Sequence, residues 1–224
     1  MARPYTVLAL AAAVCALVLA EGAAAATPAA PGTCPPAAAG APPAAPGAPP
    51  AAAAAAKIRA PASALVVCVA ATAISGKTFD HWAFVAERGG DRHPTRHRLL
   101  GEVLGFLIAS YWTIGEAAAQ GVTVTEAQVS RRFDTIRHQQ FPHRGEFARF
   151  LRSSGETVGD LLFRVRLNML SQGLQHKVLA AAGSKKEQEQ ALVEFIKGFK
   201  ARWQSQTYCA PRFAVADCGH IQAL

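Results

Sequence analysis

The segment from Gly22 to Ala56 contains no leucine, isoleucine, valine or aromatic residue and consists almost wholly of alanine, proline and glycine. A chain of this composition cannot bury enough apolar surface to offset the entropy lost on folding, which excludes a packed core there. Proline keeps such a chain extended and glycine keeps it loose, so we expect a linker over residues 27–60. The remaining residues, 61–224, are numerous enough for one ordinary domain.

Long apolar runs are also scarce. The longest one near the start, Thr6 to Ala20, is shorter than the ~20 residues that span a bilayer. It follows Arg3 and precedes small residues, and Ala24-Ala25-Ala26 offers a cleavage site, so the pattern predicts a signal peptide over residues 1–26. We therefore expect an exported protein, either secreted or held in the cell envelope. An uncleaved signal anchor is the alternative.

Acidic residues are few: 15 Asp and Glu face 23 Lys and Arg, and the formal net charge is +8. The basic residues crowd between Arg88 and Arg98. In an exported protein this indicates a solvated basic surface, or attraction to anionic lipid and wall polymers, rather than a nucleic-acid partner. We therefore expect membrane or cell-wall proximity and no nucleic acid.

Cysteine is sparse, with five residues in the chain. Loss of the leader would remove Cys15 and leave four, which allow three pairings. Cys209 and Cys218 are close in sequence and are expected to form a disulfide in an oxidising compartment, whereas the pairing of Cys34 and Cys68 is left open, with a free thiol at either as one alternative. Because Cys-x-x-Cys spacing and neighbouring His pairs are lacking, we expect no metal and no cofactor.

The folded part shows mainly helical periodicity. We expect a strand over residues 64–74, followed by a short helix capped by Thr78 and a second helix from about Arg98. Capping boxes at Thr125 and Thr157 each open a further helix, and a short helix lies between them and ends at Gly155. A last helix is expected after Ser184. A second strand is expected over Phe213–Cys218. Because a lone strand leaves its backbone groups unpaired, the sequence predicts a mainly α fold with a small two-stranded pairing of the N- and C-terminal strands.

Several of these segments resemble a known family. These segments are Phe79-Asp-His-Trp82, Phe141-Pro142, Phe147 to Leu151, Asp160 to Leu167, and the run from Gln190 to Cys218. Together they resemble the N-terminal chaperone domain of the SurA and PrsA foldases, in its actinobacterial form. The resemblance implies a helical fold like that of the trigger factor C-terminal domain. Those foldases usually carry a parvulin prolyl isomerase domain, which would fall near residues 182–186, where only a few residues are present.

The resemblance implies an ATP-independent extracytoplasmic chaperone that binds unfolded or exported polypeptides through an apolar groove. Aromatic residues and methionine would supply the contact area. The candidates for client binding are Trp82, Phe106, Tyr111, Trp112, Phe141, Phe150, Phe163 and Met169. The alternatives are a prolyl isomerase, by resemblance only, and an envelope scaffold with one dedicated partner.

No catalytic centre is expected. The neighbours Asp80 and His81 point in different directions on a helix and so do not form a pair. Asp80 is expected to support the helix N-terminus through the helix dipole instead. Glu116 is expected to form an ordinary ion pair with Arg164 or Arg166.

Overall fold

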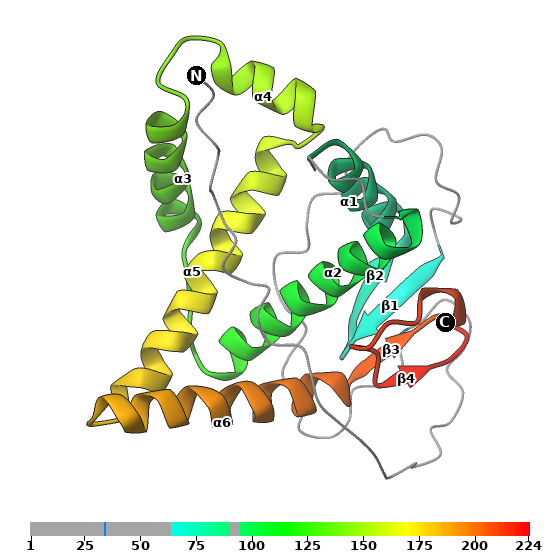
Figure 1. Ribbon diagram of the computed structural model, residues 1–224, viewed down its shortest axis with the longest axis vertical. Helices are drawn as coiled ribbons and strands as arrows, with labels where there is room; N and C mark the ends of the chain where they lie inside the picture. Colours follow the sequence, from blue (N-terminus) through cyan, green and yellow to red (C-terminus); the bar gives the residue numbers. More distant parts are fainter. Residues whose placement is uncertain (1–33, 35–63, 90–94) are drawn as a thin grey trace.

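The computed structural model describes Cys34, residues 64–89 and residues 95–224. The predicted signal peptide, and all of the predicted linker except Cys34, lie outside these residues. Six helices and a small sheet make up the described part (Figure 1). The elements are β1 (Leu65–Val69), β2 (Thr72–Ser75), α1 (Gly76–Gly89), α2 (Arg96–Ala119), α3 (Glu126–Gln140), α4 (Glu146–Ser154), α5 (Val158–Ala180), α6 (Lys185–Gln204), β3 (Thr207–Cys209), a 3-10 turn (Pro211–Phe213) and β4 (His220–Ile221).

The expected mainly α fold is confirmed, but the sheet has four strands rather than two. Its order is β2-β1-β3-β4, with β1 antiparallel to both neighbours and β4 parallel to β3. The two ends of the fold do meet, because Val67 lies opposite Cys209 and Cys68 lies opposite Tyr208. The C-terminal partner is thus Thr207–Cys209, and the predicted strand Phe213–Cys218 is wrong.

The physical reason lies at Pro211. Proline has no backbone N–H to give to a ladder, and here it starts a 3-10 turn that sends the chain out of the sheet. The Phe213 ring then packs edge-on against Phe79, with the ring centroids 5.2 Å apart. The expected single strand over residues 64–74 is also broken, since Ala70 adopts a positive φ of 49° and reverses the chain into the β1–β2 hairpin.

Two disulfides hold the sheet region. The predicted bond between Cys209 and Cys218 is present, with the Cα atoms 5.8 Å apart. Cys34 and Cys68 are bonded to each other as well, so neither is the free thiol that the sequence left open. Disulfides persist in oxidising compartments, which agrees with the expected extracytoplasmic location.

The main core lies between the sheet, α1, α2, α5 and the C-terminal end of α6. Trp203 of α6 is 2% exposed and packs so closely on Gly115 of α2 that a Cβ there would stand 2.1 Å from the indole ring. The neighbouring Glu116 is fully buried. Its carboxylate accepts hydrogen bonds from Trp203 Nε1 at 2.7 Å, from Arg202 at 2.6 Å and from Gln120 at 3.1 Å.

These contacts correct the expected pairing of Glu116 with Arg164 or Arg166. The partner comes instead from α6, which crosses α2 near its C-terminal end. A buried carboxylate needs a cation and hydrogen-bond donors to offset its lost hydration, and Arg202 and Trp203 supply both. Trp112 adds a second link to the end of α6, since its Nε1 donates to the Thr207 hydroxyl at 2.8 Å.

Local capping explains where the helices begin. The predicted capping boxes at Thr125 and Thr157 are both present, and a third one opens α6 at Ser184. The first helix begins at Gly76, because the hydroxyl of Ser75 accepts the Thr78 N–H at 3.2 Å; the prediction that Thr78 is the cap was wrong. Gly121, with φ 67°, ends the second helical segment as expected.

α3, α4 and most of α5 lie on the side of the molecule away from the sheet (Figure 1). α2 packs against α5, and α6 packs against α5 and returns the chain to β3. We call residues 126–154, which form α3 and α4, the arm. The arm contacts the rest through α5 and α1. Among the described residues, no helix combines the length and apolar character needed to cross a bilayer.

Candidate client-binding site

The structure divides the eight candidate residues into two groups. Four are buried in the main core: Trp82, Tyr111, Trp112 and Phe163. Four are half-buried: Phe106, Phe141, Phe150 and Met169. Only the second group presents apolar surface to solvent in this conformation.

Tyr111 and Trp112 are buried and serve the core. Trp112 is 3% exposed, packs edge-on against Phe199 and donates to Thr207. Burial raises the pKa of the Tyr111 hydroxyl to about 12, so this side chain stays neutral. Neither residue offers a surface on which a polypeptide could dock.

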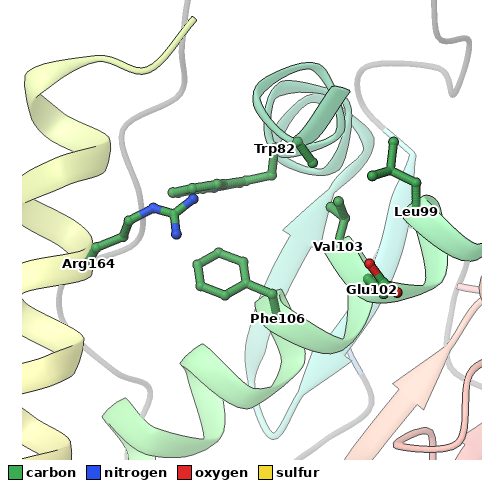
Figure 2. Close-up of a pocket in the computed structure, with 7 residues that line it drawn as sticks. Trp82, Leu99, Glu102, Val103, Phe106 and Arg164 are labelled. Carbon is green, nitrogen blue, oxygen red and sulfur yellow. The ribbon is translucent and has the colours of Figure 1, made fainter. Parts of the chain in front are cut away.

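A surface hollow of about 240 Å³ lies where α1, α2 and α5 meet (Figure 2). Its wall is mostly apolar, with one cation and one carboxylate. The residues that line it are Trp82, Ala86, Leu99, Glu102, Val103, Phe106 and Arg164. We call this site the α1–α2–α5 hollow.

Arg164 covers the aromatic floor of the hollow. Its guanidinium carbon lies 4.9 Å from the Trp82 ring centroid and 5.2 Å from that of Phe106, and the two rings are themselves 4.9 Å apart (Figure 2). A guanidinium above aromatic rings is stabilised by the ring quadrupole. The ordered cation therefore presents N–H donors beside an apolar surface.

Two carboxylates border this cation. Arg164 Nε lies 3.1 Å from Glu156, and across the hollow Glu102 accepts from Arg98 at 2.9 Å. Burial raises the pKa of the Glu156 carboxyl, and the nearby charge of Arg164 opposes that rise. Each charged group at the hollow is thus already paired, Arg164 with Glu156 and Glu102 with Arg98.

The arm carries a separate aromatic cluster of four phenylalanines, Phe133, Phe141, Phe147 and Phe150. The ring of Phe147 lies 6.0 Å from Phe133 and 5.4 Å from Phe141, and Phe141 lies 5.1 Å from Phe150. All four are half-buried, and none belongs to the main core. We call this group the arm cluster.

The arm has little interior of its own. α4 has no buried residue and α3 has only Val129. Gly155, with φ 73°, turns the chain from α4 into α5, and a Cβ there would stand 2.6 Å from the Phe84 ring. This close turn sets the arm beside α1, where Arg88 donates to the Arg152 carbonyl at 3.5 Å.

A buried contact between a histidine and an aspartate fixes the start of α5 next to the hollow. His81 Nε2 on α1 lies 2.9 Å from Asp160 Oδ2, which also accepts from the Thr157 N–H at 2.7 Å. Burial alone would raise the pKa of the Asp160 carboxyl, but the hydrogen bonds from His81 and Thr157 outweigh it and hold that pKa below its ordinary value. His81 thus does pair with an aspartate, but that aspartate lies on α5.

Sequence reasoning missed three residues of this region as candidates: Phe133, Phe147 and Arg164. The signal for Phe147 was its spacing of three residues from Phe150, which places both on one helical face. Arg164 carried no local signal, because its role depends on where α5 crosses α1 and α2. Among the described residues, no group of His, Cys, Asp or Glu side chains could hold a metal ion.

Comparison with known proteins adds no identity to this geometry: no family model, no curated protein and no solved structure matches the chain.

Proposed function

We propose that this protein is an ATP-independent extracytoplasmic chaperone module that holds unfolded or exported polypeptides. The arm cluster is the observation that carries the proposal. Four phenylalanines gather on α3, on the turn after it and on α4, outside the main core and only partly buried. The cluster joins α3 to α4 and is separate from the main core, and the partly exposed surface of its rings is free to contact a client.

The proposed binding is driven by burial of aromatic surface that is exposed to water in the free protein. Removing apolar surface from water is favourable by about 25 cal/mol per Å², and phenylalanine has no polar group that would demand a matching partner. A client segment that covers half-exposed rings therefore gains free energy with little dependence on its sequence. This is the binding property that a chaperone for many clients requires.

The α1–α2–α5 hollow would extend this surface. Phe106 is half-buried there, and the guanidinium of Arg164 lies beside it. Donors at the edge of an apolar wall can satisfy carbonyl groups of an extended polypeptide, which would otherwise lose their hydration on binding. We include the hollow in the proposed client-binding surface on this ground.

The experiment measures suppression of aggregation. Three unrelated chemically unfolded proteins are diluted into buffer, and light scattering is followed with and without the full chain. We expect the wild type to suppress the scattering of all three, and the double variant Phe141→Ser/Phe150→Ser to lose most of this effect. Val193→Ser is the matched control, since Val193 is an apolar residue on α6 that is 62% exposed and lies outside the arm.

Phe106→Ala tests the hollow separately and is expected to give a partial loss. Suppression by the double variant at the wild-type level would overturn the role of the arm cluster. Suppression of one protein but not the others would favour a dedicated scaffold. The proposal contains no catalytic step, so acceleration of a proline-limited refolding reaction by the protein would contradict it and favour a prolyl isomerase.

A further inference from the structure

The outer surface of the arm carries arginines that its aromatic cluster does not use. The arginines that are exposed there are Arg131, Arg132, Arg144, Arg149 and Arg152. They come from α3, from the turn after it, and from α4. Within the described part of the chain, none of these five forms an ion pair with a carboxylate.

The acidic residues of the arm cannot neutralise them, because each is already engaged. Glu126 pairs with Arg166 of α5, Asp134 lies 3.2 Å from Arg137, and Glu146 accepts the His143 N–H at 3.0 Å. The arm therefore has a net positive surface that is not balanced by its own carboxylates.

Helical geometry separates this surface from the arm cluster. Arg131 precedes Phe133 by two positions, and Arg149 follows Phe147 by two, so each arginine points roughly 200° away from the paired ring. The same holds for Arg152 and Phe150. The phenylalanines face one another between α3 and α4, while these arginines face solvent on the opposite side.

We propose that the outer surface of the arm docks onto a bilayer that contains anionic phospholipid. Unpaired arginines outside an apolar pocket suit a diffuse layer of negative charge, because each cation gains from the surface potential without needing a shaped partner. An acidic polypeptide is another source of negative charge for such a surface, and polyglutamate represents it in the experiment. In this arrangement the arm cluster, which lies between α3 and α4, does not face the bilayer.

The experiment uses the full chain and co-sedimentation with vesicles. One set of vesicles is phosphatidylcholine alone, and the other contains about one third phosphatidylglycerol. Because each basic residue near an anionic surface strengthens binding by about fivefold, several arginines acting together should give partitioning to the anionic vesicles at least about tenfold above that to neutral ones at low salt. Binding should fall steeply as salt is raised.

The test variant replaces four arm arginines: Arg131→Gln, Arg132→Gln, Arg149→Gln and Arg152→Gln. The control variant removes the same charge elsewhere, at exposed lysines of α1 and α6: Lys77→Gln, Lys185→Gln, Lys186→Gln and Lys197→Gln. We expect the arm variant to lose at least about tenfold in partitioning and the lysine variant to lose less than threefold. Equal losses in the two variants would overturn the proposal, because net charge rather than the arm would then explain binding.

Polyglutamate separates the membrane from an acidic polypeptide. If it binds the protein as strongly as anionic vesicles do at equal charge concentration, the proposed partner is wrong. The inference stands apart from the proposed chaperone role, since the arm arginine variant should still suppress aggregation like the wild type. Far-UV circular dichroism of both variants checks that a loss of binding is not a loss of folding.

Discussion

The main core and the arm use aromatic residues in opposite ways. In the core, Trp112 and Trp203 are buried, and each indole N–H has a buried partner, Thr207 for the first and Glu116 for the second. In the arm, four phenylalanines are half-buried and have no polar group to place. The core aromatics therefore fix one arrangement of helices, whereas the arm aromatics can exchange one apolar neighbour for another.

The same contrast holds for charge. The buried carboxylates of the core and its border, Glu116 and Asp160, each meet a cationic or hydrogen-bonding partner from a different helix. The arm instead leaves five arginines without an acidic partner among the described residues. The core pairs these two buried carboxylates with groups on other helices, and the arm presents both apolar and cationic groups outward, which is the property that the two proposals use.

The largest predicted effect concerns the closest contact of the core. Gly115→Ala places a Cβ 2.1 Å from the ring of Trp203, which is buried and held by its hydrogen bond to Glu116. We expect the free energy of unfolding to fall by about 3 kcal/mol, measured by urea denaturation with tryptophan fluorescence. Gly198→Ala on α6, where nothing lies within 4 Å of the new Cβ, should instead stabilise by about 0.5–1 kcal/mol.

The next effect concerns the closing disulfide of the core. Cys209→Ser/Cys218→Ser opens a loop with a sequence separation of 9 and should reduce the free energy of unfolding by about 2–3 kcal/mol. Suppression of aggregation should persist below the new unfolding transition, because the arm cluster lies on other elements. Loss of suppression while the tryptophan signal still reports a folded core would contradict the separation of the two regions.

Local signals made the helices predictable. The capping boxes at Thr125 and Thr157 and the stop at Gly121 each depend on residues within one turn, so the sequence places them directly. The strand boundaries were harder to predict, since Ala70 adopts its positive φ without being glycine or asparagine. At the C-terminus, Pro211 is a local signal against a strand, and the prediction of a strand over Phe213–Cys218 did not take it into account.

Contacts between distant segments could not be predicted. Glu116 was assigned to α5 because nothing in the sequence says that α6 crosses α2, and the bond between Cys34 and Cys68 depends on the position of a segment far from the strand. The candidate list mixed core and surface aromatics for the same reason. A helical face that contains Tyr111 looks like one that contains Phe150 until the neighbouring helices are in place.

A smaller and pH-dependent effect is expected at the border of the two regions. The pKa of Asp160 is held below its ordinary value of 3.8, so the folded state binds this proton less readily than the unfolded state. Its stabilisation is fully present above that ordinary pKa and is lost as the pH falls through the lowered folded value. Asp160→Asn should therefore reduce stability by about 1–2 kcal/mol at pH 7, and the difference from wild type should shrink below pH 3.8.

Urea midpoints measured from pH 7 to pH 3 check this expectation. Glu189→Gln, at an exposed position on α6, is the control and should follow the wild type throughout. A difference between wild type and Asp160→Asn that stays constant over the whole range would show that the ionised carboxylate is not the source of the stabilisation. The pair with His81 would then be a packing contact only.

The smallest effect on overall stability should come from the arm itself. All three tryptophans, Trp82, Trp112 and Trp203, lie in the main core, so their fluorescence does not report the arm. Phe147→Ala removes the ring that joins Phe133 to Phe141, and we expect a change of about 1 kcal/mol or less in the tryptophan-monitored unfolding. Amide hydrogen exchange in α3 and α4 should accelerate by about tenfold, while exchange in β1 and α2 stays unchanged, because α4 has no buried residue to hold it once the cluster is broken. Equal acceleration in both regions would mean that the arm and the core unfold as one unit. The arm would then have no separate stability of its own.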